Sequence, residues 1–270
     1  LFNHRIVTNP MEPRGGVGVF DPGAGRYTLH VSSQNIHINR DFIAETLGAS
    51  RDDVRWLAPD VGGGFGAKNF AYVEQALLLW AAKRTGRPVK WIASRSEVFL
   101  TDHQSRDHDA VARLALDAEG HFLGLEIDSI ANLGAYMVGS AGGVHTFQYA
   151  HLPGTIYVIP AIALRVRTAL SHTTPIGVTR GPGFAEMVNI VERLIDEAAT
   201  VTGISRLDLR RRNFVQPSAM PRTNPLGNTV DSGDFPAALE QAITRADASS
   251  FETRRAASSK RLGLGVACHI

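Results

Sequence analysis

The sequence predicts an α+β protein, in which mixed sheets and hairpins stand beside separate helices. Strand patterns occur in hairpins, helix patterns occur in separate blocks, and a regular alternation of strand and helix is missing. A doubly wound parallel sheet would need that alternation. Hydrophobic residues make up 44% of the 270 residues and charged residues 20%, which is enough apolar material for a packed core.

The first part of the chain predicts short strands around two helices. Residues 26–33 alternate between apolar and polar side chains and predict a strand, and residues 54–58 predict a shorter one. Residues 38–47 have helical spacing, with a glycine directly after them as a stop signal. The clearest helix is predicted over 72–85, and it ends before a Gly-Arg-Pro segment.

The remaining elements include one hairpin and one long helix. Segments 108–116 and 122–131 flank Asp-Ala-Glu-Gly, a strong turn signal, and predict a hairpin. The long helix is predicted over 184–202, where apolar residues recur at helical spacing. Further predictions are strands at 89–93 and 163–170, helices at 207–213 and 236–246, and an alternating strand at 263–270.

Charge and cysteine content exclude several classes of protein. The net charge is +2, so no strong positive field is available for nucleic acid or anionic membranes. No apolar run of about 18 residues predicts a transmembrane helix. A single cysteine, Cys268, excludes a disulfide framework and a Cys-ligated cluster within this chain. The histidines are scattered, and we expect His103 and His108 to be surface or loop residues rather than metal ligands.

The chain begins Leu-Phe-Asn-His, without an initiator Met or a signal peptide, and it stops within a predicted strand. We therefore expect a piece of a longer protein. Its location is expected to be cytoplasmic, with the periplasm as the alternative.

The most informative local feature is a glycine loop, Asp-Val-Gly-Gly-Gly-Phe-Gly-Ala-Lys-Asn, at residues 60–69. It lacks the Ser/Thr that follows the lysine of a P-loop. Gly62, Gly64 and Ala67 match a dinucleotide-binding fingerprint, but the chain continues into a hairpin rather than a second β–α–β crossover. Consecutive small residues expose backbone N–H groups that can bind an anionic or oxygen-rich ligand. A large apolar residue among them, Phe65, is expected to be anchored.

This loop resembles the molybdenum-cofactor loop in large subunits of the xanthine dehydrogenase, aldehyde oxidase and carbon monoxide dehydrogenase family. Other segments resemble the same family in the same order. These are Asn9–Arg14, Ser33–Asn35, Leu133–Tyr136, Thr174–Gly183, Arg211–Phe214 and Asp231–Phe235. The resemblance covers essentially all 270 residues. It implies that residues 1–270 are the N-terminal molybdopterin-binding region of a longer large subunit, with sub-lobes at 1–175 and 176–270.

The resemblance also implies a set of cofactor contacts. Gln34 would donate an amide hydrogen bond to an oxygen on molybdenum, a role that suits a neutral donor. Arg180 and its neighbours would hold the pterin, which is itself the metal's ligand, so direct protein ligands are not expected. The expected cofactor-binding residues are Gln34, Gly63, Gly64, Phe65, Gly66, Arg180 and Gly181, and Asn69 and Pro182 are expected in the substrate pocket.

Departures from the family pattern narrow the expected substrate. Asn69 stands where xanthine-oxidising members have a glutamate, which disfavours a purine. Gly181 stands where true carbon monoxide dehydrogenases have a cysteine that bridges copper, which disfavours a molybdenum–copper site. An aldehyde or N-heteroaromatic substrate remains. The family's catalytic glutamate lies downstream of this region, and we expect Glu12, Glu186 and Glu192 to be structural.

The implied activity is hydroxylation with water-derived oxygen by a molybdenum hydroxylase, although this chain alone is expected to be inactive. The implied cofactor is molybdopterin, with the cytosine dinucleotide as one form. Implied partners are the rest of the large subunit, a [2Fe–2S] subunit and an FAD subunit. Two alternatives stay open: a non-catalytic scaffold fragment of such a complex, and a dinucleotide-binding dehydrogenase.

Overall fold

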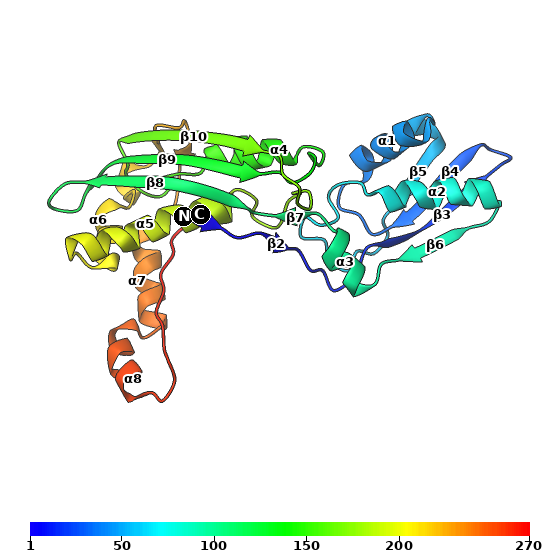
Figure 1. Ribbon diagram of the computed structural model, residues 1–270. Coiled ribbons are helices and arrows are strands. Elements are labelled where there is room, and N and C mark those ends of the chain that lie inside the picture. The colour runs from blue at the N-terminus through cyan, green and yellow to red at the C-terminus, as the bar shows by residue number, and fades with distance from the viewer.

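A computed structural model describes residues 1–270 and contains two lobes, each with one four-stranded sheet (Figure 1). The strand order is β5-β4-β3-β6 in the smaller lobe and β1-β8-β9-β10 in the larger lobe. Helices cover these sheets in separate groups rather than alternating regularly with the strands. The predicted α+β class is therefore confirmed.

The smaller lobe packs two helices against its mixed sheet. Strands β3 and β4 are antiparallel, whereas β5 runs parallel to β4 because helix α1 crosses between them. Its core contains fully buried Leu29, Ile43 and Leu79. The elements are β3 (Gly15–Asp21), β4 (Arg26–Val31), α1 (Ile36–Leu47), a 3₁₀ turn (Arg51–Asp53), β5 (Val54–Leu57), α2 (Val73–Thr85) and β6 (Val89–Ile92).

Strand β3 was not predicted because it is rich in glycine. Glycine usually weakens a strand, yet it allows another backbone to come close. A Cβ atom at Gly18 would lie 2.6 Å from the carbonyl oxygen of Leu78 in α2. The glycine thus allows helix α2 to pack in direct contact with the sheet. Sequence periodicity cannot predict a strand whose glycines are required by such a contact.

The larger lobe is built on the predicted hairpin and the predicted long helix. Strands β8 and β9 are antiparallel, β10 adds in parallel to β9, and β1 pairs with the outer edge of β8. Helix α5 packs against β8 and buries Met187, Ile190 and Ile195. The elements are β1 (Phe2–Asn3), β8 (His108–Leu116), β9 (Phe122–Asn132), β10 (Ala161–Ala169), α5 (Phe184–Thr202), α6 (Arg206–Asn213), α7 (Phe235–Arg245) and α8 (Phe251–Ala257).

The remaining short elements either connect the two lobes or lie in the larger lobe. Strands β2 (Ile6–Val7) and β7 (Gln104–Ser105) pair between the lobes, next to helix α3 (Arg95–Thr101) (Figure 1). The others are α4 (Ala141–Gly143), a π-helical turn (Val144–Gln148), 3₁₀ turns (Pro217–Ala219 and Ala248–Ser250), and the pair β11 (Arg222–Thr223) and β12 (Thr229–Val230).

The two apolar cores do not meet at the expected sub-lobe boundary after residue 175. Residues 27–79 supply the smaller core, whereas the larger core combines buried residues between Ala110 and Leu239. Strands β8 and β9 and helix α5 share this larger core. A boundary after residue 175 would separate that helix from the sheet on which it packs.

The predicted strand at 263–270 is wrong, although its alternation is real. Side chains of Leu264, Val266 and Cys268 are partly buried and their neighbours are exposed, but the segment has no strand partner. A buried arginine, Arg210, instead donates a hydrogen bond to the carbonyl of Val266 at 3.1 Å.

None of the helices is long and apolar enough to cross a bilayer.

Truncation of Ile190 tests the larger core. Its side chain is fully buried on α5, so Ile190→Ala should lower the free energy of unfolding by about 2–5 kcal/mol through lost burial and a cavity. Val201→Ala is the control, because Val201 lies on the same helix and is 77% exposed; it should change stability by less than about 0.5 kcal/mol. Urea unfolding measures both, and equal effects would contradict this assignment of the core.

Candidate functional site

The first glycine loop, residues 60–69, follows β5 and precedes α2, and its backbone has left-handed conformations that favour glycine. Phe65 and Gly66 have φ of 52° and 104°. A Cβ atom at Gly66 would collide with the carbonyl oxygen of Val178 in the second glycine segment. Phe65 is 48% exposed, so packing within this chain does not anchor it, and its anchoring by a ligand stays a prediction. The small residues therefore allow the first glycine loop to lie against the second glycine segment.

The side chain of Gln34 is held by this loop through its carbonyl end. Its Oε1 accepts hydrogen bonds from the backbone N–H of Gly66 at 2.8 Å and of Lys68 at 3.2 Å. Its own backbone N–H donates to the carbonyl of Lys68 at 3.0 Å. The amide nitrogen of Gln34 has no partner in the chain, and the residue is exposed. Because the carbonyl is occupied, Gln34 presents N–H donors at the surface of the loop.

An ion pair between buried Lys68 and partly exposed Glu12 fixes the other side of the loop. The Glu12 carboxylate accepts hydrogen bonds from Lys68 Nζ at 2.7 Å, from the Ser32 hydroxyl at 2.6 Å and from the N–H of Gly62 at 2.7 Å. Partial burial opposes ionisation of Glu12, but hydrogen bonds from Lys68, Ser32 and Gly62 hold its pKa below the ordinary value. The loop is thus tied through Glu12 to the segment Asn9–Arg14 as well as to Gln34.

The second glycine segment, residues 174–183, lies directly against the first. The N–H of Arg180 donates to the carbonyl of Phe65 at 2.9 Å, and the hydroxyls of Thr8 and Thr179 are hydrogen bonded. Arg180 is exposed, and no heavy atom lies within 4 Å of the position that a Cβ of Gly181 would occupy. The structure therefore brings the two predicted loops into direct hydrogen-bonded contact.

The two residues expected in a substrate pocket lie at the ends of these loops. Asn69 closes the first loop, and its backbone carbonyl accepts a hydrogen bond from the amide of Asn39 at 3.3 Å. The side chain of Asn69 makes no hydrogen bond, and Pro182 is half-buried in the second segment. The side chain of Asn69 thus takes no part in the hydrogen bonds that hold the loops, and contact of Asn69 and Pro182 with a ligand stays a prediction.

Three residues for which the sequence predicted no role at the site, His145, His108 and Arg106, hold the second glycine segment. His145 and Arg106 contact its backbone directly, and His108 contacts His145. The buried ring of His145 donates from Nε2 to the carbonyl of Gly177 at 2.8 Å, and His108 Nε2 lies 3.0 Å from His145 Nδ1. Arg106 donates to the carbonyls of Arg180 at 2.9 Å and Gly181 at 3.0 Å.

The expectation that His103 and His108 are surface or loop residues is wrong for His108, which lies on strand β8, whereas His103 does lie in the loop between α3 and β7. Both are buried, and burial is the main cause that lowers the pKa of His103 to about 4 and of His108 to about 3. His145 and Arg106 add to the shift at His108. A signal was available, since His108 shares the inward-facing side of its strand with Ala110.

The glutamates behave as expected of structural groups. Glu186 is fully buried and pairs with Arg106 at 2.9 Å, and Glu192 pairs with fully buried Arg210 at 2.8 Å. Ligand atoms of His108, His145 and Glu186 lie within 4.8 Å of one another. However, Arg106 already neutralises the only carboxylate of that group, which leaves no net negative charge to attract a cation.

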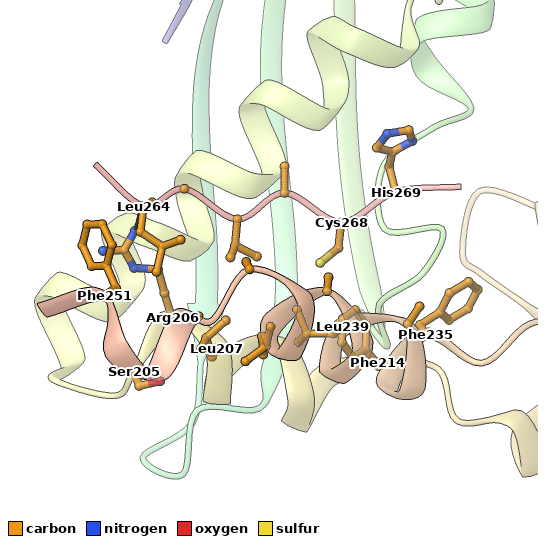
Figure 2. Close-up of a pocket in the computed structure, with 18 of the residues that line it drawn as sticks. Ser205, Arg206, Leu207, Phe214, Phe235, Leu239, Phe251, Leu264, Cys268 and His269 are labelled. Atoms are coloured by element: carbon orange, nitrogen blue, oxygen red, sulfur yellow. Dashed lines mark hydrogen bonds between the residues drawn. The ribbon is translucent and has the colours of Figure 1, made fainter. Parts of the chain in front are cut away.

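A large apolar groove lies away from both glycine loops. It has a volume of about 830 Å³ between α6, α7, α8 and the C-terminal segment. Figure 2 shows Leu239 and Phe235 of α7 on one wall and Leu264 and Cys268 on the extended segment opposite. Its lining holds few polar groups, whereas the paired glycine loops offer many. Size alone therefore does not make it the candidate site.

The comparisons with known proteins agree with the loop geometry. The molybdopterin cofactor-binding domain family matches residues 1–214, and the chain belongs to this family. Over 95% of its length it is 30% identical to the carbon monoxide dehydrogenase large chain of Hydrogenophaga pseudoflava. Over 98% it is 32% identical to subunit gamma of the 6-hydroxypseudooxynicotine dehydrogenase complex of Paenarthrobacter nicotinovorans. The chain spans 32% and 35% of these relatives, which is about a third of their length.

Solved structures share the fold. Quinoline 2-oxidoreductase from Pseudomonas putida 86 superposes with a TM-score of 0.85 and 31% identity, covering 94% of this chain and 33% of that one. The aldehyde oxidoreductase of Desulfovibrio gigas gives a TM-score of 0.85 and 26% identity, covering 96% and 28%. These likenesses confirm the predicted resemblance to the molybdenum hydroxylase family.

The residues present fit a molybdopterin cofactor. The free amide of Gln34 and the open side of Gly181 face space that no side chain of this chain occupies at hydrogen-bond distance. Neutral N–H donors suit the oxygen and sulfur atoms of such a cofactor.

The carboxylate of Glu12 should control the stability of the first loop. In Glu12→Gln the charged bond to Lys68 is lost, so amide hydrogens in residues 60–69 should exchange roughly five-fold faster, as about 1 kcal/mol of lost hydrogen bonding implies. Hydrogen exchange with mass spectrometry measures this rate. Glu45→Gln, on the exposed face of α1, is the control, and equal protection in both variants would refute the role of Glu12.

The buried His108 should make stability depend on pH. Its folded pKa of about 3 lies below the ordinary 6.5, so the unfolded chain binds the proton first and stability falls as pH drops from about 6.5 toward 3. His108→Gln should flatten this decline, and His103 and His145 should leave a residual slope because their pKa values are also lowered. Urea unfolding at pH 7, 6, 5 and 4 tests this, with exposed His172→Gln as control. An unchanged slope in His108→Gln would contradict the prediction.

Proposed function

We propose that this chain is the molybdenum-cofactor-binding part of a large subunit that hydroxylates an aldehyde or N-heteroaromatic substrate with water-derived oxygen. The observation that carries the proposal is the hydrogen bonding of the Gln34 side chain. Two backbone N–H groups occupy its carbonyl, and its amide nitrogen is left free beside the junction of the two glycine loops.

The chain's own residues would bind and orient the cofactor. Gln34 would donate to an oxygen on the metal, and the backbone of Gly63, Gly64, Phe65 and Gly66 would lie along the dithiolene and pterin. Arg180 is exposed and would hold the pterin by charge and hydrogen bonding, with Gly181 beside it. When bound, the cofactor supplies the redox centre, and the protein supplies position and hydrogen bonds.

Two positions support the substrate class. Asn69 and Pro182 lie at the loop ends, and a neutral amide at residue 69 can hydrogen bond a ring nitrogen or carbonyl without adding charge. Gly181 offers no thiolate to bridge a second metal. Relatives named for N-heteroaromatic substrates include nicotine 6-hydroxylase and quinoline 2-oxidoreductase, and this likeness favours an N-heteroaromatic substrate here as well.

The remaining machinery is assigned to other parts of the complex. The catalytic base would come from the C-terminal part of the large subunit, since the three buried or paired glutamates of this chain are committed to ion pairs. Iron–sulfur clusters and FAD would lie on partner subunits, because Cys268 alone cannot hold a cluster. The cytosine dinucleotide form of the cofactor is part of this proposal.

The dinucleotide-binding alternative is weaker for a structural reason. The N–H of Gly62, which would have to face a pyrophosphate, donates to the Glu12 carboxylate at 2.7 Å. A negative group at that position repels phosphate. The scaffold alternative differs from the proposal in metal content and in activity, so metal analysis together with an activity assay decides it.

Gln34→Glu tests the donor role of Gln34 with little change in shape. The new side chain can still accept from Gly66 and Lys68, but it cannot donate and it adds negative charge. Turnover of the assembled complex should fall about 10- to 100-fold, as for other groups that orient metal ligands. Gln241→Glu, exposed on α7, is the control. Wild-type turnover in Gln34→Glu would reject this role.

Metal analysis tests the function itself. The purified complex with its full-length large subunit should contain close to one molybdenum and one pterin per large subunit. Incubation with aldehydes and N-heteroaromatics in H₂¹⁸O should place the label in the product, as mass spectrometry detects. A metal-free and inactive complex, purified from a host that loads a related enzyme, would favour the scaffold alternative.

A further inference from the structure

One partly buried arginine, Arg106, contacts the backbone of the second glycine segment. Arg106 donates from Nη2 to the carbonyl of Arg180 at 2.9 Å and from Nη1 to the carbonyl of Gly181 at 3.0 Å. The same Nη1 contacts the carboxylate of Glu186 at 2.9 Å. The guanidinium therefore holds two successive carbonyls of the loop and one buried acid at the start of α5.

The backbone that carries Arg106 is unusual. Arg106 and Asp107 have φ of 71° and 69°, a left-handed conformation that side-chain-bearing residues seldom adopt, here in two successive residues. The turn is held from outside, since the N–H of Asp107 donates to Asn3 and its carboxylate accepts from Arg5 at 2.7 Å. Surrounding contacts thus maintain a strained turn that aims Arg106 at the loop.

Glu186 explains why an arginine is needed at this place. Its side chain is fully buried, and a buried carboxylate is costly unless a cation is paired with it. One of its oxygens, Oε1, has no hydrogen-bond partner, so Arg106 is its principal compensation. Arginine stays charged at all accessible pH values, and its planar fork can reach several acceptors at once, which a lysine ammonium cannot do in the same geometry.

The orientation of one peptide group follows from these contacts. In a trans peptide the C=O and the N–H point in opposite directions. Because the carbonyl of Arg180 points to Arg106, the N–H of Gly181 points away from it. That N–H has no partner in the chain, and the side on which a Gly181 Cβ would stand is open. The next residue is Pro182, which has no N–H to offer.

We propose that Arg106, held by Glu186, is a positioning residue that turns the Gly181 N–H toward the bound molybdenum cofactor as a hydrogen-bond donor. This inference rests on the proposed function. It assigns to the two residues a role beyond stability, because the same guanidinium that neutralises a buried acid also sets the direction of a donor at the site. The donor complements the free amide of Gln34 on the first loop.

The experiment separates charge compensation from loop orientation. It uses the complex with its full-length large subunit, and variants Arg106→Lys and Arg106→Met/Glu186→Leu. The lysine keeps the charge opposite Glu186 but cannot hold both carbonyls. The double variant removes both buried charges, a change that proteins often tolerate in stability. Arg113→Met is the matched control, since Arg113 forms an exposed ion pair with Glu126 on the hairpin.

Three readouts are taken: melting temperature, molybdenum per large subunit, and hydrogen exchange of peptides that span residues 178–186. In at least one of the two Arg106 variants we expect a melting temperature within a few degrees of wild type. In that variant, molybdenum content should be at least five-fold lower and the Gly181 amide should lose protection. The control should match wild type in all three readouts.

Other results overturn specific claims. A loaded wild type, together with Arg106 variants that fold, hold as much molybdenum and show the same exchange, would overturn the role of Arg106 and leave the proposed function intact. Loss of molybdenum only in proportion to unfolding would also overturn it, because that would reduce Arg106 to a stability role. A wild-type complex without molybdenum would overturn the proposed function itself.

Discussion

The close approach of two glycine segments is the constraint on which the site depends. One segment belongs to the smaller lobe and the other precedes α5 of the larger lobe, and the carbonyl of Phe65 accepts a hydrogen bond from Arg180 across the junction at 2.9 Å. Gly66 permits this contact because a Cβ there would collide with the carbonyl of Val178. Any side chain at residue 66 would push the loops apart and with them the donors that they present.

Ion pairs that each contain a buried partner hold this irregular backbone in place. Lys68 and Glu12 secure the first loop, Arg106 and Glu186 secure the second, and Arg210 holds the C-terminal segment through its contact with Val266. Loops cannot satisfy their polar groups through regular ladders, so charged side chains supply the missing partners. The distribution of these pairs follows the distribution of irregular backbone.

The geometry also explains why the large apolar groove beside α7 is a poor guide to the chemistry of this chain. The groove beside α7 is mostly apolar and offers little that could orient a reactive group (Figure 2). The paired loops present free N–H donors next to an exposed arginine. An oxygen-rich cofactor is recognised by directed donors rather than by volume, and this agrees with membership in the molybdopterin cofactor-binding domain family.

The sequence alone determined the elements whose patterns are local. The long helix at 184–202 and the hairpin around residues 117–120 were predicted closely, because helical and alternating periodicity depend only on neighbouring residues. The site loops were also found, since glycine clusters are visible without a structure. Only the tertiary structure decided how these loops meet, and whether Asn69 and Pro182 line a substrate pocket remains a prediction.

Four further features needed the folded chain. Strand β3 was missed because its glycines matter only where α2 packs, and His108 was misplaced because burial depends on what covers the strand. The segment 263–270 alternates like a strand but finds no neighbouring strand to pair with. Arg106 lies 74 residues before Arg180, and no local pattern links them. Contacts between distant segments are set by the packing of the two lobes, which a linear sequence does not display.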